Sequence, residues 1–352
     1  MPIGIEKTRG RASASASVWF GDGSDGSYNA GGATLTVQNK NGSYDGDMVV
    51  KQYTDFNLTG GTFTADQACR GMLILVQGDC VINGTINMNQ KGPHANPTTG
   101  GASDGGTVPS AGLQFAAPGG SSSFSNFGGN VAGCGNAAVS AMSVMDSLSG
   151  NAVVGTLVRQ GAAGAGRTSN HNNGNPGSNG GIGQTGGGGS GGINNNGTAG
   201  GGSYGSCWGG GSGGAGASHH TSSGSGSTWG GPGGNATGYS SHRCTGGVGN
   251  PGGNGYYIGT AVTGTGGAII IIVGGTISGS GTITAQGINN DALGAVSAHG
   301  GASGGGNILI MSVTDSFSGS TSVSGGATTS TLNTQGGAGG NGSVQRLTVA
   351  AA

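Results

Sequence analysis

Apolar and polar positions follow one arrangement in three segments of the chain, 71–92, 267–287 and 306–326. Each segment has a glycine, a short apolar run, a turn, a short alternating stretch, a Gly or Ser turn and a further alternating stretch. Alternation with period 2 gives a strand one inward face, and glycine supplies the positive φ that tight corners need. The position after the opening glycine is Ala268 in the second segment and Asn307 in the third, a spacing typical of repeat architectures. The pattern predicts an all-β fold, a β-solenoid of stacked short strands, with a β-sandwich as the alternative.

Further short strands are predicted on either side of these segments, because short apolar or β-branched runs are bounded there by Asn-Gly, Asp-Gly and Gly-Gly turns. They cover residues 33–37, 47–51, 56–58, 62–64 and 343–349. The last of them is expected to cap the final repeat. A short helix is expected over 137–148, where apolar residues recur at Val144, Met145 and Leu148.

The chain divides by composition into five parts. They are an attachment arm (1–17), an N-terminal β unit (18–92), a Gly/Ala/Ser-rich connector with the short helix (93–160), a glycine-rich region (161–255) and a C-terminal β-repeat unit (256–352). The glycine-rich region has no strict Gly-X-Y period, which excludes collagen. A flexible linker is one interpretation of it. A linker has no use for Trp208 and Trp229, however, so we predict an ordered, polyglycine-II-like region in which backbones lie side by side.

Charge is scarce, with 7% charged residues and a net charge of −1 in 352 residues that include 89 glycines. An ordinary soluble enzyme is therefore not expected. Nucleic acid is not an expected partner, because no basic face could neutralise phosphates. No signal peptide is evident, and the apolar runs are too short to span a bilayer, so membrane insertion is not expected. A part made in the cytoplasm and carried out within a particle would reconcile these features.

The cysteines and the ionisable residues offer few candidates for chemistry. Two disulfides are conceivable, Cys69 with Cys80 and Cys207 with Cys244, with buried reduced thiols as the alternative. Asp22 and Asp25 are weak calcium candidates, although a hydrogen-bonded turn explains them better. No metal site and no cofactor are predicted. Carboxylates are too sparse after residue 104 for a glycosidase pair, and no Ser lies on a nucleophile elbow. We therefore expect no enzymatic activity.

The order of the motifs along the chain resembles that of a known protein family. Residues 19–26, Trp-Phe-Gly-Asp-Gly-Ser-Asp-Gly, precede the strand-and-turn units, the first repeat, a long glycine tract and a final block ending TISGSGTITAQG. In this order, the chain from about residue 18 to 349 resembles glycine-rich tail-fibre, spike and adhesin proteins of tailed bacteriophages. The resemblance implies a virion protein that binds the host surface, with other virion proteins and a host glycan or outer-membrane protein as partners. Here the glycine tract lies between β blocks, a departure that bears on whether it forms a distal tip.

Candidate contact residues follow from side-chain chemistry. Aromatic, Asn and Ser side chains on loops give large contact areas at low entropy cost and suit sugars. The receptor-contact candidates are Tyr204, Trp208, Trp229, Tyr239, His242 and Arg243, and the virion-attachment candidates are Glu6, Lys7, Arg9 and Arg11. A homo-oligomer is expected, with a trimer favoured. The alternatives to an adhesin are a structural capsid or tail decoration protein and a bacterial surface or ice-binding protein.

Overall fold

A computed structural model describes three main parts of the chain and a few short segments between them. The described residues are 20–92 (apart from 41, 44, 45, 47 and 70), 176–181, 185–188, 198–199, 229–230, 236–237, 266–289, 302–327 and 337–348. The arm 1–17, the expected helix 137–148 and most of the region 161–255 lie outside the described part. No helix long and apolar enough to cross a membrane occurs among the described residues.

The described residues form strands and no helices, so the fold of this part is all-β. The N-terminal strands are β1 (Tyr28–Ala30), β2 (Ala33–Leu35), β3 (Val49–Tyr53), β4 (Phe56–Leu58), β5 (Thr62–Ala65), β6 (Met72–Val76), β7 (Cys80–Ile82) and β8 (Thr85–Asn87). Three two-residue strands follow, β9 (Thr198–Ala199), β10 (Trp229–Gly230) and β11 (Ala236–Thr237). The C-terminal strands are β12 (Ala268–Gly279), β13 (Thr282–Thr284), β14 (Asn307–Phe317), β15 (Ser320–Ser322) and β16 (Ser343–Thr348).

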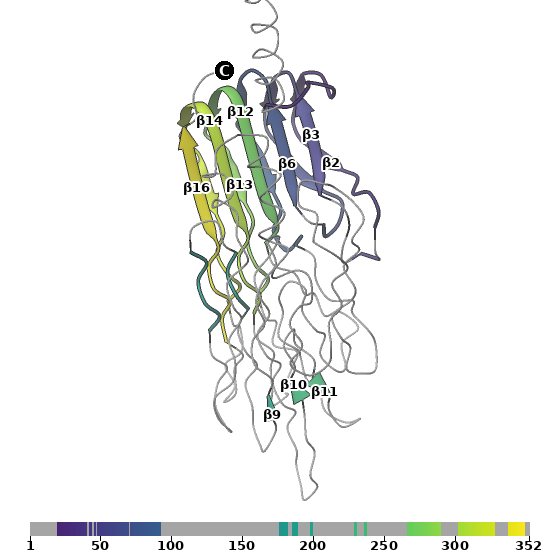
Figure 1. The fold of residues 1–352 in the computed structure, drawn as a ribbon, viewed down its shortest axis with the longest axis vertical. Helices are drawn as coiled ribbons and strands as arrows, with labels where there is room; N and C mark the ends of the chain where they lie inside the picture. The colour runs from purple at the N-terminus through teal and green to yellow at the C-terminus, as the bar shows by residue number, and fades with distance from the viewer. Residues whose placement is uncertain are drawn as a thin grey trace, which may run out of the picture.

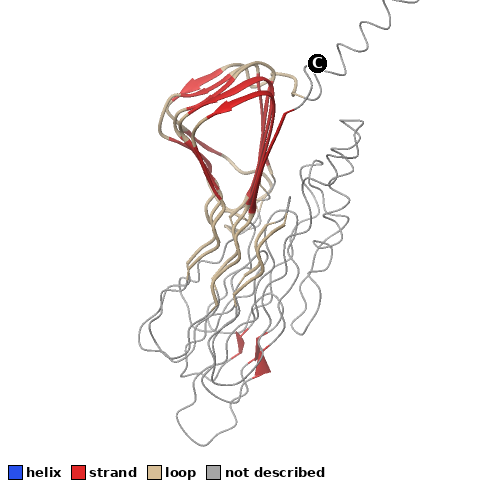
Figure 2. Cartoon of the chain, turned by 90° about the vertical axis from the view of Figure 1, so that its left-hand side faces the viewer, coloured by secondary structure: helices blue, strands red, loops and turns tan. Residues whose placement is uncertain are grey.

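Two parallel sheets organise these strands. In the eight-stranded sheet the order is β1-β4-β7-β12-β14-β16, and β3 and β6 extend it through the pairs β3 with β6 and β6 with β12. The five-stranded sheet has the order β15-β13-β8-β5-β2. Figure 1 shows β3, β6, β12, β14 and β16 side by side, and Figure 2 shows that the strands outline a three-sided cross-section. Segments that visit these sides in turn are called passes below; one pass is β6, β7 and β8.

The strand register joins segments far apart in the sequence. Ile269 is aligned with Met72 of β6 and with Ile308 of β14, so the first repeat lies directly against the second. The aligned positions Ala268 and Asn307 each follow the glycine that opens the second and third repeats. The predicted spacing from Ala268 to Asn307 is therefore the distance along the chain from β12 to β14, whereas β6 and β12 are much farther apart in the sequence.

The core lies inside the three-sided outline. Alternate residues of each strand point into it, among them Phe56, Phe63, Ile86, Ile271 and Ile310, all fully buried. At the end of the core formed by the first passes, rings take the place of aliphatic side chains. Tyr28 stacks on Phe56 with ring centroids 4.9 Å apart, and the Phe63 ring meets Phe56 edge-on at 5.3 Å.

The apolar runs are continuous because both faces of these strands are buried. Ile269 and Ile271 belong to the core, while Ile270 and Ile272 point away from it and are still only 2% exposed. Parallel strands covered on both faces commonly show such unbroken runs. This arrangement explains why alternation is visible only in the shorter strands of each repeat.

Two strand boundaries differ from the expectation. In the second and third repeats the apolar run and the stretch after it form one strand, β12 and β14, where two strands were expected. The register shifts between Val273 and Thr276, and this irregularity accommodates Gly274 and Gly275. A Cβ on Gly274 would lie 2.4 Å from Gln77 O, so the close approach of β12 to the preceding pass requires glycine here.

Candidate functional site

Extended segments rich in glycine continue the chain from one corner of the strand stack. We call them the glycine array; they are residues 176–181, 185–188, 285–289, 302–306, 323–327 and 337–342. In the C-terminal repeats one segment leaves after β13 or β15, and another leads into β14 or β16. Figure 2 shows such loop segments extending from one corner of the three-sided outline.

Hydrogen bonds link each segment of the array to several others. Segment 302–306 donates from Ser303 N to Ile288 O (3.1 Å) and from Gly305 N to Gly340 O (2.9 Å). It accepts at Gly305 O from Gly186 N and at Ser303 O from Gly326 N, both at 2.8 Å. This one segment therefore bonds to four others, whereas a strand in a sheet bonds to at most two neighbours. The array is thus packed in two dimensions across its axis.

Such close packing depends on the absence of side chains. A Cβ added to Gly304 would lie 1.8 Å from Gly186 O, and one added to Gly340 would lie 2.0 Å from Ser178 O. Real Cβ atoms essentially never come within 3.0 Å of another heavy atom in this way. Glycine is therefore required at these positions by space, whatever its backbone angles.

Asparagine side chains complete the hydrogen bonding where backbone carbonyls are not in reach. Asn179 Oδ1 accepts from Asn341 N (2.9 Å), and Asn341 Oδ1 accepts from Gly325 N (3.0 Å). Asn289 Oδ1 accepts from Ala327 N at 2.8 Å. All three asparagines are exposed, so each side-chain carbonyl takes the place of a neighbouring backbone at the surface of the array.

The outward positions of the five-stranded sheet form a row of hydroxyl groups. Thr62, Thr85, Thr282 and Ser320 are aligned on successive strands. Thr282 Oγ1 and Ser320 Oγ lie 3.0 Å apart, within hydrogen-bond distance. This side of the stack therefore presents uncharged polar groups at the spacing of parallel strands.

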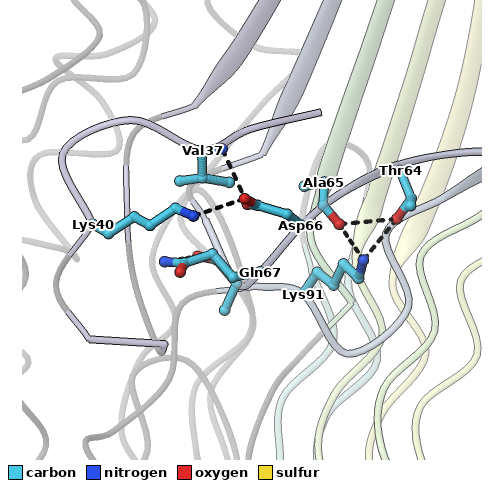
Figure 3. A network of polar contacts seen from close by, with 8 residues as sticks. Val37, Lys40, Thr64, Ala65, Asp66, Gln67 and Lys91 are labelled. Atoms are coloured by element: carbon cyan, nitrogen blue, oxygen red, sulfur yellow. Dashed lines mark hydrogen bonds and ion pairs between the residues drawn. The ribbon is translucent and has the colours of Figure 1, made fainter. Parts of the chain in front are cut away.

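Two lysines, one after β2 and one after β8, bind residues at the end of β5 (Figure 3). Lys91 Nζ donates to Thr64 Oγ1 (2.8 Å) and to Ala65 O, at the end of β5. Burial lowers the pKa of Lys91, and nearby Cys69 and Asp66 oppose the shift. For Asp66 the largest single effect is burial, which raises the pKa of a carboxyl group. Hydrogen bonds from Lys40 Nζ (2.7 Å) and Val37 N (3.1 Å) together outweigh the effect of burial, so the pKa of Asp66 is lowered.

The opposite end of the core is closed by an ion pair. The Arg346 guanidinium donates to both carboxylate oxygens of Asp315 and to Phe317 O, and it lies 5.5 Å from the centre of the Phe317 ring. The hydrogen bond to Asp315 raises the pKa of Arg346, and the same bond lowers the pKa of Asp315. Arg346 is aligned with Ile310 and Asp315 with Ile277, and both isoleucines point into the core. The ion pair therefore closes the core at its last strand.

Most of the candidate contact residues lie outside the described residues. This applies to Tyr204, Trp208, Tyr239, His242 and Arg243, to Glu6, Lys7, Arg9 and Arg11, and to Cys207 and Cys244. Trp229 lies in β10, where it is aligned with Thr198 of β9 and Thr237 of β11. The structure therefore does not bring the receptor-contact candidates together or separate them.

The candidate disulfide between Cys69 and Cys80 is not formed. Cys69 Sγ donates to Gly71 O at 3.4 Å, and Cys80 lies in the core with a pKa that burial raises. Both side chains are fully buried thiols, with Cys69 in the link between β5 and β6 and Cys80 in β7.

The weak calcium candidates take part in turn and pass contacts. Asp22 Oδ1 accepts from Ser24 N (2.9 Å), and Asp25 binds Lys51 Nζ and Gln52 N at 2.7 Å each. Within the described residues no three His, Cys, Asp or Glu side chains gather as metal ligands would. The hydrogen-bonded turn expected at residues 21–25 accounts for both carboxylates.

Sequence reasoning missed the asparagines of the array and the Arg346–Asp315 pair. The available signal for Asn341 was its position between Gly-Gly and a predicted strand, where a side-chain amide can replace a backbone hydrogen-bonding group. Comparison with protein-family models, with curated proteins and with solved structures found no match.

Proposed function

We propose that this chain is a virion structural protein of a tailed bacteriophage, acting as a fibre, spike or receptor-binding adhesin. In this proposal the passes of strands are the coils of a β-solenoid. The glycine array is a polyglycine-II-like bundle inserted at one corner of the solenoid. The observation that carries the proposal is the four-neighbour bonding of segment 302–306.

A rigid, uncharged scaffold is what such a part needs outside the cell. Each array segment is fixed by backbone hydrogen bonds to several neighbours, so its stability depends little on charge and therefore little on salt. The described segments of this array leave the stack from a common corner. The charge-poor composition and the order of motifs along the chain support the same assignment.

The receptor-contact candidates remain Tyr204, Trp208, Trp229, Tyr239, His242 and Arg243, with a host glycan or outer-membrane protein as the target. Virion attachment is assigned to the arm through Glu6, Lys7, Arg9 and Arg11. The proposed location is the virion surface, and no catalytic step or cofactor belongs to the proposal.

Two measurements test this function. Mass spectrometry of purified particles of the phage that carries the gene is expected to detect the chain, and its absence there would refute a virion role. Fluorescently labelled protein is then expected to adhere to permissive host cells and to lose that adhesion when Trp208 and Trp229 are both replaced by Ala. A chain present in virions that adheres to no permissive host would instead be a capsid or tail decoration protein. The control is Val81→Ala, which alters an outward position of β7 far along the chain from both tryptophans.

A further inference from the structure

β16 is the last strand of the eight-stranded sheet, and it has one neighbour among the described strands. It pairs with β14 over its whole length, from Ser343 to Thr348. Figure 1 places it at the margin of the sheet. The strand contains no proline, lysine or bulge, and its one charged residue, Arg346, is paired with Asp315 of β14.

The backbone groups on its outer side belong to every second residue. Ser343 N donates to Gly306 O, so Ser343, Gln345 and Leu347 bond toward β14. Val344, Arg346 and Thr348 direct their N–H and C=O groups away from it. Val344 is 36% exposed and is the one large exposed hydrophobic residue of the described part.

Gln345 adds a polar group that lacks partners. Its residue is 9% exposed, and neither Nε2 nor Oε1 has a hydrogen bond. A buried amide in this state loses the free energy of its hydration without replacement. A second amide of the same kind would satisfy both atoms at once, because each carboxamide has a donor and an acceptor.

The other end of the stack does not offer a matching edge. Residues 21–27 cover β3 there, with Asp25 N donating to Gln52 O and Thr54 N to Gly26 O, both at 2.8 Å. The Lys51–Asp25 ion pair fastens the same cover at 2.7 Å. β1, the end strand of the eight-stranded sheet there, has only three residues, so this end presents no edge of the length of β16 for head-to-tail pairing. Two identical β16 edges can meet in an isologous, antiparallel pair.

We infer that β16 pairs with β16 of a second copy about a twofold axis at Gln345. An antiparallel pair must align residues that bond outward with one another, so the axis passes through a single residue. An axis at Arg346 would set like charges directly opposite each other, which is unfavourable. An axis at Gln345 places the two carboxamides opposite each other and lays the Arg346 stem of one copy over the exposed Val344 of its partner.

This dimer follows from the edge itself and does not depend on the proposed function. It differs from the trimer expected of a fibre, because a threefold arrangement would need two different edges from each copy. Light scattering of the purified protein is expected to give twice the monomer mass. A monomer or a trimer would overturn the inference.

Cross-linking tests the register. In a protein with Cys134, Cys207 and Cys244 replaced by Ser, we expect Gln345→Cys to form an intermolecular disulfide under mild oxidation. At a non-hydrogen-bonded antiparallel pair the two Cα atoms lie about 4.5 Å apart, within disulfide range. The matched control is Leu347→Cys, whose copies would lie out of register and about 13 Å apart. We expect about tenfold slower cross-linking for the control.

A charge variant gives an independent reading. Val344→Lys would face Arg346 of the second copy and is expected to shift the protein to monomer, while Val344→Thr retains the dimer. Circular dichroism of each variant reports whether the fold is intact. Equal cross-linking of Gln345→Cys and Leu347→Cys, or an unchanged mass for Val344→Lys, would show that β16 is not the interface.

Discussion

The close packing of the glycine array leads us to predict that adding one methyl group at Gly304 destabilises the protein strongly. Its Cβ would lie 1.8 Å from Gly186 O, where 3.0 Å is the practical minimum. Segments 302–306 and 185–188 must then move apart until that minimum is reached. The 2.8 Å hydrogen bond from Gly186 N to Gly305 O joins these two segments and would break.

The size of the effect follows from what is lost. A broken hydrogen bond costs about 0.5–1.5 kcal/mol, and each buried backbone group left without a partner costs about 1–3 kcal/mol. Gly304→Ala is therefore expected to lower the free energy of unfolding by about 2–5 kcal/mol. An alanine also restricts the unfolded chain and so stabilises by about 0.4–1 kcal/mol, an effect that a suitable control shares.

Gly60→Ala is the matched control, because nothing lies within 4 Å of the Cβ position at Gly60. Thermal unfolding followed by circular dichroism should give a melting temperature for Gly304→Ala at least about 4 °C below that of Gly60→Ala. Hydrogen exchange should locate the change, with faster exchange in 302–306 and unchanged exchange in β6. Equal melting temperatures for the two variants would refute the close-packed array.

The other predictions concern the core and its two ends. Phe63→Ala should lower the free energy of unfolding by about 3–5 kcal/mol in denaturant titrations, because Phe63 is fully buried among other rings; a loss below about 1 kcal/mol would contradict that packing. Arg346 lowers the pKa of Asp315, so the pair stabilises the fold above the unfolded pKa of about 3.9, and this contribution is lost as the pH falls through the folded pKa. The melting temperature of Asp315→Asn should accordingly fall below that of the wild type at pH 6, by the equivalent of about 1 kcal/mol or less, and approach it below pH 4; a difference that persists in acid would exclude the ion pair as its cause. Alkylation mapped by mass spectrometry should leave Cys69 and Cys80 unmodified in the native protein and label both after denaturation.

The strands of the β units could be predicted well from the sequence. The pattern placed strands at 33–37, 56–58, 62–64 and 343–349, and the structure has β2, β4, β5 and β16 at these positions. Alternation and glycine punctuation are local signals, and they sufficed because each strand binds the equivalent strand of a neighbouring pass. The union of two predicted strands into β12 was missed because Gly274 and Gly275 are typical of a turn and here occupy an irregularity within the strand.

The ordered glycine-rich region predicted at 161–255 stays a prediction, because most of it lies outside the described residues. Glycine content pointed to 161–255, whereas the described array also uses 285–289, 302–306, 323–327 and 337–342, within the C-terminal repeats. Which backbone lies beside Gly304 is decided by segments far away in the sequence, such as 185–188, and no local pattern carries that information. The role of Asn341 likewise depends on the position of Asn179.

The pairing of β6 with β12 has a consequence for folding while the protein is synthesised on the ribosome. β6 ends at Val76 and its partner begins at Ala268, so the whole of 77–267 must be synthesised between them. At about 5–20 residues per second, this takes roughly 10–40 s. During that interval the N-terminal passes present the bare, apolar edge of β6 to the cell, and an unpaired edge of this kind readily joins other chains. The rate of translation through the glycine-rich tract should therefore set how much of the chain escapes aggregation and reaches its closed form.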